Sequence, residues 1–213
     1  ESGPWSVYAG VLSFPPKASP SFPRKVPRMS QSSDLRIVVL VGSLRADSLN
    51  RQIAEKLVER SPEGVSIEIA EGLGDIPFYN EDLDGADVPA AAKRLRDLVA
   101  SADRLLAVTP EYNGTMPAVL NNAIDWLSRP YGRGAIKGKP FAVVGATPTP
   151  YGGQWAHEHA RRSATIAGAV APDHIAVSQT SIDVDVLGDE EVVGRLLAAV
   201  EALIAVEPVA AVA

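Results

Sequence analysis

Short runs of consecutive apolar residues alternate along the chain with longer stretches in which apolar residues recur every three or four positions. The runs at residues 37–41, 104–109 and 140–147 are mainly apolar on both faces, which is typical of strands buried in a parallel sheet. Residues 65–70 alternate apolar and polar side chains, so they predict a strand with one less buried face. A fifth strand is predicted at residues 174–178.

Helical spacing of apolar residues follows each predicted strand, and prolines or capping residues bound most of these stretches. Helices are predicted at residues 49–61, after Pro89, after Pro117, at residues 154–167 and from Asp189 onward. Strict alternation of strand and helix with right-handed crossovers predicts an α/β three-layer sandwich. Its sheet is expected to hold five parallel strands in the order 2-1-3-4-5.

The first 33 residues differ in composition from the rest of the chain. They hold six of the seventeen prolines, with scattered serines and no period. Such a segment cannot bury enough surface to offset its ordering entropy, so residues 1–33 are predicted to be a disordered Pro-rich N-terminal extension. Met29 is the first methionine, and the residues before it are expected to be an upstream extension. The folded domain is predicted at residues 34–206, followed by a tail at 207–213.

Charge and cysteine content narrow the classes of function. The net charge is −6, and because residues 1–33 carry +3, the remainder carries −9, which argues against nucleic-acid binding. No cysteine is present, which excludes disulfides, iron–sulfur clusters and thiol nucleophiles. If this chain transfers electrons, it needs a bound cofactor, because it has no cysteine for redox chemistry of its own. No apolar run approaches the length of a membrane span, so a cytoplasmic protein without membrane contact is predicted.

The loop after the first strand is rich in groups that bind anions. Gly42 allows a tight turn, Ser43 and Ser48 supply hydroxyls, Arg45 supplies a fixed cation, and Asn50 supplies an amide. Together with the free N–H groups of a helix start, these groups predict a phosphate cradle. The alternative is that Ser48 is only an N-cap and Arg45 only a solvated cation. Both interpretations stay open, since neither the dinucleotide fingerprint nor a P-loop is present.

The predicted strand order places further loops beside this cradle. Ligands of open parallel sheets bind outside the carboxyl ends of the strands, where the order reverses between strands 1 and 3. The loops after strands 1, 3 and 4 contain GSLRADSLN, PEYNGTM and TPTPYGG, whereas those at the opposite edge are plain. A phosphate at the first loop and a planar ring over the other two would suit flavin mononucleotide, FMN.

Four segments, GSLRADSLN, PFYNEDLD, PEYNGTMPAVLNNAIDWLSRP and KPFAVVGAT with its following YGG, resemble the NADPH-dependent FMN reductase family. The resemblance extends from about residue 35 to the last helix and excludes residues 1–33. It implies a flavodoxin-like fold and an oxidoreductase of the type that includes quinone, chromate and azo-compound reductases. It also implies cofactor-binding residues in the three loops, namely Ser43, Arg45, Ser48, Leu49, Asn50, Pro110, Glu111, Tyr112, Asn113, Thr147, Gly152 and Gly153.

The family resemblance further implies how the chemistry is divided. NADPH, or NADH, delivers hydride to the flavin, which reduces a small acceptor, so no catalytic side chain and no metal are expected. A homodimer or homotetramer with the flavin near the subunit interface is implied. Five residues are then candidates to contact a substrate or a second subunit: Tyr79, Asn80, Glu81, Arg129 and Tyr131.

Two other classes of protein stay open at this point. A flavodoxin-type electron carrier would share the sheet but lack a nicotinamide site, and a non-redox domain would bind another phosphate ligand. His157 and His159 are two positions apart on a predicted helix, so they do not face each other as metal ligands would. Both histidines are predicted to be solvated.

Overall fold

The computed structural model describes residues 34–209. The predicted Pro-rich extension, residues 1–33, lies outside the described residues, as do residues 210–213 of the predicted tail. The domain boundaries that the sequence predicts therefore remain predictions.

Five parallel strands form one sheet in the order β2-β1-β3-β4-β5, which confirms the predicted topology. The strands are β1 (Leu35–Val41), β2 (Val65–Ile69), β3 (Arg104–Val108), β4 (Phe141–Thr147) and β5 (Ala176–Thr180). The last strand begins two residues later than predicted, because its pairing with β4 aligns Ala176 with Val143 and continues to Thr180 opposite Thr147.

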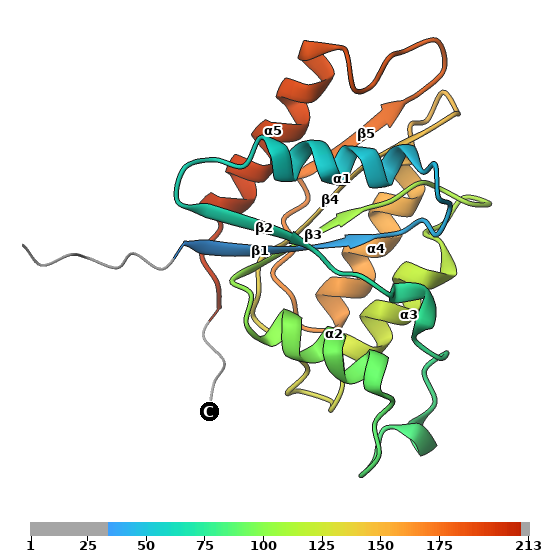
Figure 1. Ribbon diagram of the computed structural model, residues 1–213, viewed down its shortest axis with the longest axis vertical. Helices are drawn as coiled ribbons and strands as arrows, with labels where there is room; N and C mark the ends of the chain where they lie inside the picture. Colours follow the sequence, from blue (N-terminus) through green and yellow to red (C-terminus); the bar gives the residue numbers. More distant parts are fainter. Residues whose placement is uncertain (1–33, 210–213) are drawn as a thin grey trace, which may run out of the picture. The chain divides into compact units, whose positions relative to one another are not determined.

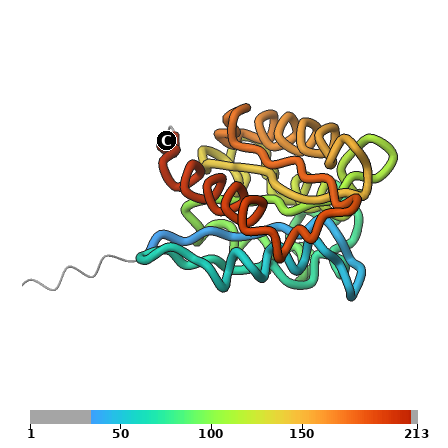
Figure 2. The backbone as a smooth tube through the Cα atoms, turned by 90° about the horizontal axis from the view of Figure 1, so that it is seen from above, coloured from blue at the N-terminus to red at the C-terminus, as the bar shows by residue number. Residues whose placement is uncertain are grey.

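Four α-helices connect the strands at the predicted places, a fifth follows β5, and the crossover after β2 adds two short 3-10 helices. They are α1 (Leu49–Glu59), η1 (Leu73–Asp75), η2 (Glu81–Leu83), α2 (Ala90–Ala100), α3 (Ala118–Leu127), α4 (Gln154–Ile166) and α5 (Glu190–Ala205). Both ends of the described chain lie at the edge of the sheet where β1 begins (Figures 1 and 2).

Alternate residues of the strands enter two separate cores. Val38 and Leu40 pack with α2, α3 and α4, whereas Ile37, Val39 and Val41 pack with α1 and α5. This division follows from the two-residue period of a strand, and it confirms the three-layer arrangement that Figure 1 shows. The all-buried strands β3 and β4 therefore lie between the two helical layers.

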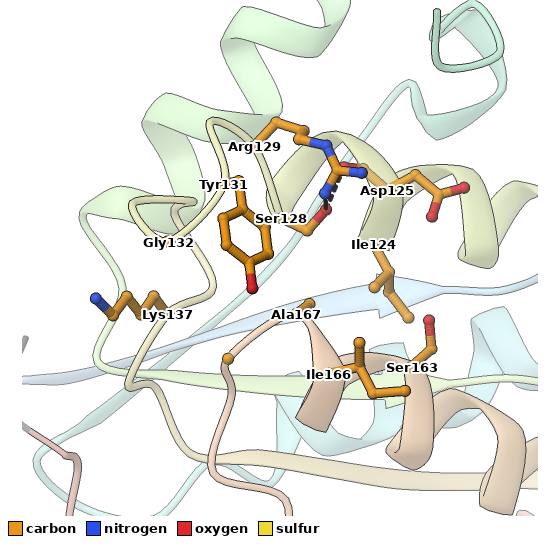
Figure 3. Close-up of a pocket in the computed structure, with 11 residues that line it drawn as sticks. Ile124, Asp125, Ser128, Arg129, Tyr131, Gly132, Lys137, Ser163, Ile166 and Ala167 are labelled. Carbon is orange, nitrogen blue, oxygen red and sulfur yellow. Dashed lines mark hydrogen bonds between the residues drawn. The ribbon is translucent and has the colours of Figure 1, made fainter. Parts of the chain in front are cut away.

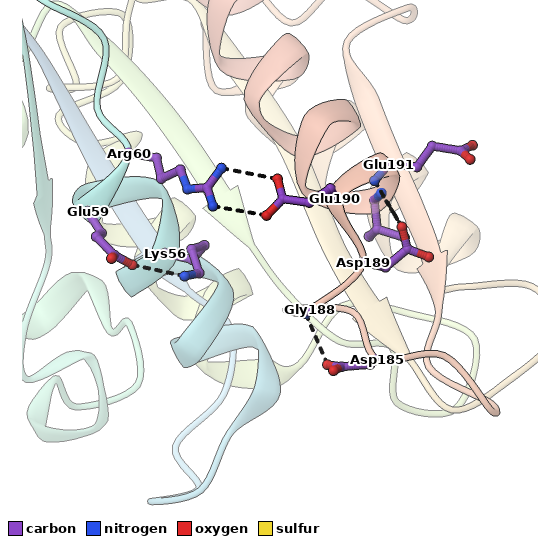
Figure 4. A network of polar contacts seen from close by, with 9 residues as sticks. Lys56, Glu59, Arg60, Asp185, Gly188, Asp189, Glu190 and Glu191 are labelled. Carbon is purple, nitrogen blue, oxygen red and sulfur yellow. Dashed lines mark hydrogen bonds and ion pairs between the residues drawn. The ribbon is translucent and has the colours of Figure 1, made fainter.

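A polar network on the α1 and α5 side links the two helices at the surface (Figure 4). Arg60 pairs with both carboxylate oxygens of Glu190 at 3.1 and 3.2 Å, and Lys56 pairs with Glu59 at 3.0 Å. Asp189 caps α5 through the amides of Glu191 and Val192. Lys56 is partly buried and the other groups are solvent-exposed, so the ion pairs contribute little to stability.

The crossover between β2 and α2 is more ordered than a plain surface loop. Arg96 holds Asp84 through two hydrogen bonds of 2.6 and 2.8 Å, and this guanidinium keeps the pKa of Asp84 below its usual range. Tyr79 packs edge-on against the buried Trp126 with ring centroids 5.0 Å apart. Phe78, in contrast, is 77% exposed, so the aromatic residues of this segment do not all pack onto the core.

Among residues 34–209, no helix combines the length and the apolar character needed to cross a bilayer.

Candidate functional site

The candidate site begins where β3 and β4 separate. Their pairing ends at Val108 opposite Val144, and Thr109 then donates its N–H to the Val144 carbonyl at 3.0 Å before Pro110 turns the chain away. Beyond this point the backbone groups of β3 and β4 no longer form hydrogen bonds with each other. Because buried backbone groups need partners, side chains from other elements must supply them.

Asn50 supplies partners on the β4 side. Its side-chain amide donates to the carbonyl of Ala146 at 2.8 Å, and its carbonyl oxygen accepts from the Ala146 N–H at 2.9 Å. Asn50 is buried and thereby joins the first turn of α1 to the end of β4. The amide that the sequence assigned to phosphate thus already serves the backbone.

Glu111 and Thr147 hold the segment that follows β3. The N–H of Glu111 donates to the hydroxyl of the buried Thr147 at 2.9 Å. One carboxylate oxygen of Glu111 accepts the amides of Trp155 and Ala156 at 3.1 and 3.2 Å. Helix α4 begins after Gly153, which has no side chain to cap it, so Glu111 caps α4 from a distant part of the chain.

His157 supplies the partner of the Thr109 carbonyl, and it is only 1% exposed. Its Nε2 lies 3.2 Å from that oxygen, and its Nδ1 lies 2.7 Å from the Ser178 hydroxyl. Since a carbonyl only accepts, Nε2 carries the proton and Nδ1 accepts from Ser178. Burial lowers the pKa of His157 to about 4, and the positive charge of Arg161 lowers it further, against the opposing hydrogen bond to Thr109.

The prediction that both histidines are solvated is therefore wrong for His157. It holds for His159, which is exposed and lies 2.8 Å from the Thr115 hydroxyl through Nδ1. His157 lies on the inward face of α4, together with the buried Ala156 and Ala160. The sequence pattern did not predict a polar side chain on this face. A buried partner on another strand was needed to make that position tolerable.

Two glycines allow the neighbouring strands to approach Thr109. A Cβ atom at Gly145 would lie 2.1 Å from the Thr109 carbonyl oxygen, and one at Gly42 would lie 2.1 Å from its hydroxyl. Both distances are far below any real contact. Glycine at these positions therefore lets β1, β3 and β4 end close together.

A cavity of about 370 Å³ opens at this edge of the sheet, and we call it the edge cavity. It confirms that the loops after β1, β3 and β4 meet, since all three line it. The lining residues are Ser43, Arg45, Asp47, Ser48, Leu49, Asn50, Pro110, Glu111, Tyr112, Ala146, Thr147, Pro148, Thr149 and Ser181.

Some of these residues escaped sequence analysis. Asp47 lies inside the predicted phosphate loop, and Pro148 and Thr149 lie in the turn after strand 4, so their neighbours had signalled them. Ser181 follows β5, so the rule that ligands bind beyond the carboxyl ends of strands covers that loop as well.

Three predicted residues, Asn113, Gly152 and Gly153, do not line the edge cavity. Asn113 and Gly114, with φ of 53° and 73°, form the tip of a tight turn in which Tyr112 and Thr115 exchange backbone hydrogen bonds. Gly152 and Gly153 are buried beside Ser178 and Thr147, with φ of 61° and 93°. Their backbone angles favour glycine and explain these residues without a ligand.

In the loop after β1, some polar groups have hydrogen-bond partners in the protein and others do not. Ser48 is buried and accepts the N–H of Arg51 at 3.3 Å, so it is the N-cap of α1, as the structural alternative proposed. Arg45 is exposed, and within residues 34–209 its side chain makes no hydrogen bond or ion pair. The first amides of α1 also lack partners inside the helix. Because the Arg51 amide is bonded to Ser48, Arg45 and the amides of Leu49 and Asn50 are the groups available to an anion.

An apolar hollow of about 420 Å³ adjoins the edge cavity, with which it shares Arg45 and Tyr112. Gly42, Leu44, Pro117, Ala118 and Val119 complete its lining. Leu44 is 65% exposed and Tyr112 is 46% exposed, so both offer apolar surface to a ligand in this hollow.

The residues predicted to meet a substrate or a second subunit lie away from the edge cavity. Tyr79 is half-buried: its N–H donates to Asn122 at 2.8 Å, and the Arg129 guanidinium lies 5.3 Å from the centre of its ring. Asn80 caps η2 through the Asp82 amide at 3.0 Å, and Glu81 is exposed. These contacts fix the crossover rather than open a site.

Arg129 and Tyr131 border a different hollow, of about 470 Å³, at the C-terminal ends of α3 and α4 (Figure 3). We call it the helix-end hollow. It lies at the opposite edge of the sheet, because Val170, just after α4, bridges Pro140 at the start of β4. A ten-residue helix is about 15 Å long, so α3 separates this hollow from the loop containing Tyr112.

The edge cavity and the apolar hollow fit FMN in size and in the kinds of groups they offer. Their volumes lie in the range of small-molecule sites. A fixed cation and free amides suit a phosphate, while exposed apolar and aromatic groups suit a planar ring. No group of three or more carboxylate or histidine side chains suitable for a metal ion is present among residues 34–209.

The strand order and the position of the cavity define a flavodoxin-like α/β protein whose edge cavity lies at the switch point of its sheet. The sequence model of the NADPH-dependent FMN reductase family matches residues 35–181, and the chain belongs to this family. It is therefore an oxidoreductase that uses FMN and NAD(P)H. Of the three classes left open by the sequence, this finding selects the first.

Relatives support the assignment. The chain is 46% identical over 127 residues to a quinone reductase of Pseudomonas putida, covering 60% of this chain and 68% of that protein. It is 41% identical over 132 residues to an NAD(P)H-dependent FMN reductase of Pseudomonas aeruginosa, covering 62% and 70%. The structure of FerB, a flavoenzyme NAD(P)H:(acceptor) oxidoreductase from Paracoccus denitrificans, matches with a TM-score of 0.70 and 34% identity, over 80% of this chain and 95% of FerB.

Proposed function

We propose that this chain reduces small planar acceptors, with quinones as the favoured class, at a flavin whose phosphate lies in the edge cavity and whose ring reaches Tyr112. The observation that carries the proposal is the position of Arg45. This exposed cation has no partner among residues 34–209, and it lies where the polar edge cavity meets the apolar hollow. A quinone reductase relative at 46% identity supports the acceptor class, and chromate and azo compounds are further candidates.

The bound flavin supplies the redox chemistry, which is acceptance of hydride from NAD(P)H and two-electron reduction of the acceptor. Arg45, Ser43 and the first amides of α1 bind the phosphate by charge-assisted hydrogen bonds. Ser48 and Asn50 act from behind, by holding the helix start and the end of β4 in place. No side chain of the cavity is needed as an acid or base.

In this proposal the flavin ring lies between four residues of the edge cavity, namely Pro110, Glu111, Tyr112 and Thr147. Glu111 contributes its fixed backbone, because its side chain is already bonded to α4. Leu44 and Tyr112 provide exposed apolar surface at the apolar hollow, where an uncharged planar acceptor would leave water. Access to this hollow then decides which acceptors react.

Assembly into a homodimer or homotetramer is part of the proposal. Tyr131 is 88% exposed and Ile166 is 76% exposed, and both border the helix-end hollow. Contact with a second copy would remove both side chains from water. Light scattering after size-exclusion chromatography measures the mass directly, and a monomer at micromolar concentration would contradict this part.

A cytoplasmic location, where NAD(P)H is available, is also proposed.

The central experiment uses the purified chain loaded with FMN under anaerobic conditions. NADPH and NADH are each added while the flavin absorbance is followed, and benzoquinone, chromate or an azo dye is then supplied. Bleaching by a nicotinamide followed by recovery with benzoquinone is expected. A folded chain that binds no FMN, or a bound flavin that neither nucleotide bleaches, would contradict the proposed function.

A further inference from the structure

The first turns of α4 contact the segment after β3 at four polar positions. The amides of Trp155 and Ala156 bind Glu111, His157 binds the Thr109 carbonyl, and His159 lies 2.8 Å from the Thr115 hydroxyl. This helix start therefore borders the whole segment that carries Tyr112. Of the residues of α4 that make these contacts through a side chain, only His157 is buried.

His157 joins three elements that converge beneath the edge cavity. It projects from α4, donates to Thr109 at the end of β3 and accepts from Ser178 in β5. Pro110 follows Thr109 and has no N–H, so the segment loses a ladder donor where it leaves the sheet. Because the peptide between Thr109 and Pro110 is planar, the direction of the Thr109 carbonyl sets the direction in which the segment starts.

The Ser178 hydroxyl fixes the ring of His157 in turn. Because the Thr109 carbonyl requires the proton on Nε2, the Ser178 hydroxyl donates to Nδ1 across the short distance of 2.7 Å. An apolar side chain of similar size would leave the carbonyl of the buried Thr109 without a partner. His157 itself lines neither the edge cavity nor the apolar hollow, so its influence on a ligand would pass through Thr109.

We propose that His157 is a positioning residue of the reductase: through the Thr109 carbonyl it sets the placement of Pro110, Glu111 and Tyr112 against the flavin ring. The phosphate end of the site, at Arg45, is independent of it. This inference rests on the proposed function for its ligand, but the effect of His157 on the protein segment is measurable without any ligand.

The first test measures amide hydrogen exchange at Glu111 and Tyr112 in the FMN-free protein. The variants are His157→Leu, which removes both hydrogen bonds, and His157→Gln, whose side-chain amide still offers a donor to Thr109. Glu158→Gln, an exposed neighbour on the same helix, is the matched control. Exchange at both amides is expected to rise at least tenfold in the leucine variant and less in the glutamine variant. Unchanged exchange in the leucine variant would overturn the inference.

The second test separates the ring from the phosphate. Affinities for FMN and for riboflavin, which lacks the phosphate, are measured by flavin fluorescence, with inorganic phosphate as a competitor of FMN. In His157→Leu both flavins are expected to bind about tenfold more weakly, while phosphate competes as before, because the loss of one hydrogen bond affects only the segment that frames the ring. Equal flavin affinities in variant and parent, or weakening of FMN alone, would contradict the inference.

Folding failure and failure of the proposed function give different results. If His157→Leu does not fold, Ser178→Ala removes only the anchor of the ring, and the same two measurements apply with a smaller expected change. If the parent chain binds no flavin, the proposed function and the ring-placing role both fail. In that case the exchange rates still decide whether His157 holds the segment.

Discussion

The loops after β1 and β3 border the same cavity, but the fold holds them by different means. In the loop after β1, Arg45 has no partner within residues 34–209, and Leu44 is largely exposed. In the loop after β3, Glu111 uses its amide and its carboxylate for contacts with β4 and α4. The loop after β1 leaves its arginine free for a ligand, whereas the loop after β3 commits its glutamate to the protein.

This difference teaches which changes should affect binding and which should affect stability. Removing a group that has no partner in the folded protein leaves the free energy of unfolding nearly unchanged. Removing one that bonds to buried or helix-end amides leaves those amides unsatisfied. We therefore expect substitutions in the loop after β1 to change the affinity for the ligand, and substitutions of the residues that support the loop after β3 to lower the stability of the fold.

The largest expected effect concerns His157 and pH. Its pKa is about 4 in the folded protein and 6.5 in an exposed chain, so between these values the unfolded state binds the proton more readily. Stability is complete above pH 6.5 and falls as the pH drops toward 4, by about 3 kcal/mol for this group. Urea denaturation at pH 7 and pH 4.5 measures the loss, and His157→Gln should lose less over the same range. An equal loss in both proteins would mean that other groups are responsible.

Arg45→Ala should weaken the binding of FMN by about 2 kcal/mol, which is roughly a thirtyfold increase in Kd, because a hydrogen bond to a charged group is lost. Riboflavin affinity and the urea midpoint should stay unchanged. Arg60→Ala, which removes an exposed arginine far from the cavity, is the control and should alter neither flavin affinity. A lower urea midpoint together with unchanged FMN affinity would reverse the roles we assign to the two loops.

Glu111→Ala should destabilise the protein by about 1 kcal/mol, the usual effect of losing a helix cap. Glu111→Gln keeps an oxygen that accepts from Trp155 and Ala156, and so should restore most of the loss. Urea denaturation of the FMN-free proteins measures both. If Glu111→Ala left the midpoint unchanged but abolished flavin binding, its carboxylate would belong to the ligand site after all.

Asp47→Asn should have the smallest effect, a two- to fivefold tighter binding of FMN. Asp47 lines the edge cavity with Arg45, and in a hydrated site a carboxylate repels a phosphate by about 1 kcal/mol or less. The gain should shrink as salt is added, since salt screens the repulsion. Weaker FMN binding in this variant would place Asp47 among the groups that assist the ligand.

Much of the fold was predictable because its signals are local. The apolar runs of β1, β3 and β4 indicated strands covered on both faces, and the helical spacing between them indicated crossovers. Together with the handedness of crossovers, these patterns predicted the strand order and the edge at which the three loops meet. Composition added that electron transfer would need a cofactor.

Only the tertiary structure decided what the polar residues of those loops do. Asn50 bonds to Ala146, 96 positions away, and Glu111 caps a helix 44 positions away. His157 is buried because Ser178 and the Thr109 carbonyl both lie within reach. Periodicity records which face of an element is buried, but it does not record where two strands separate and leave backbone groups unpaired. For that reason the sequence determined which loops form the site, and the fold decided which of their side chains remain free to bind.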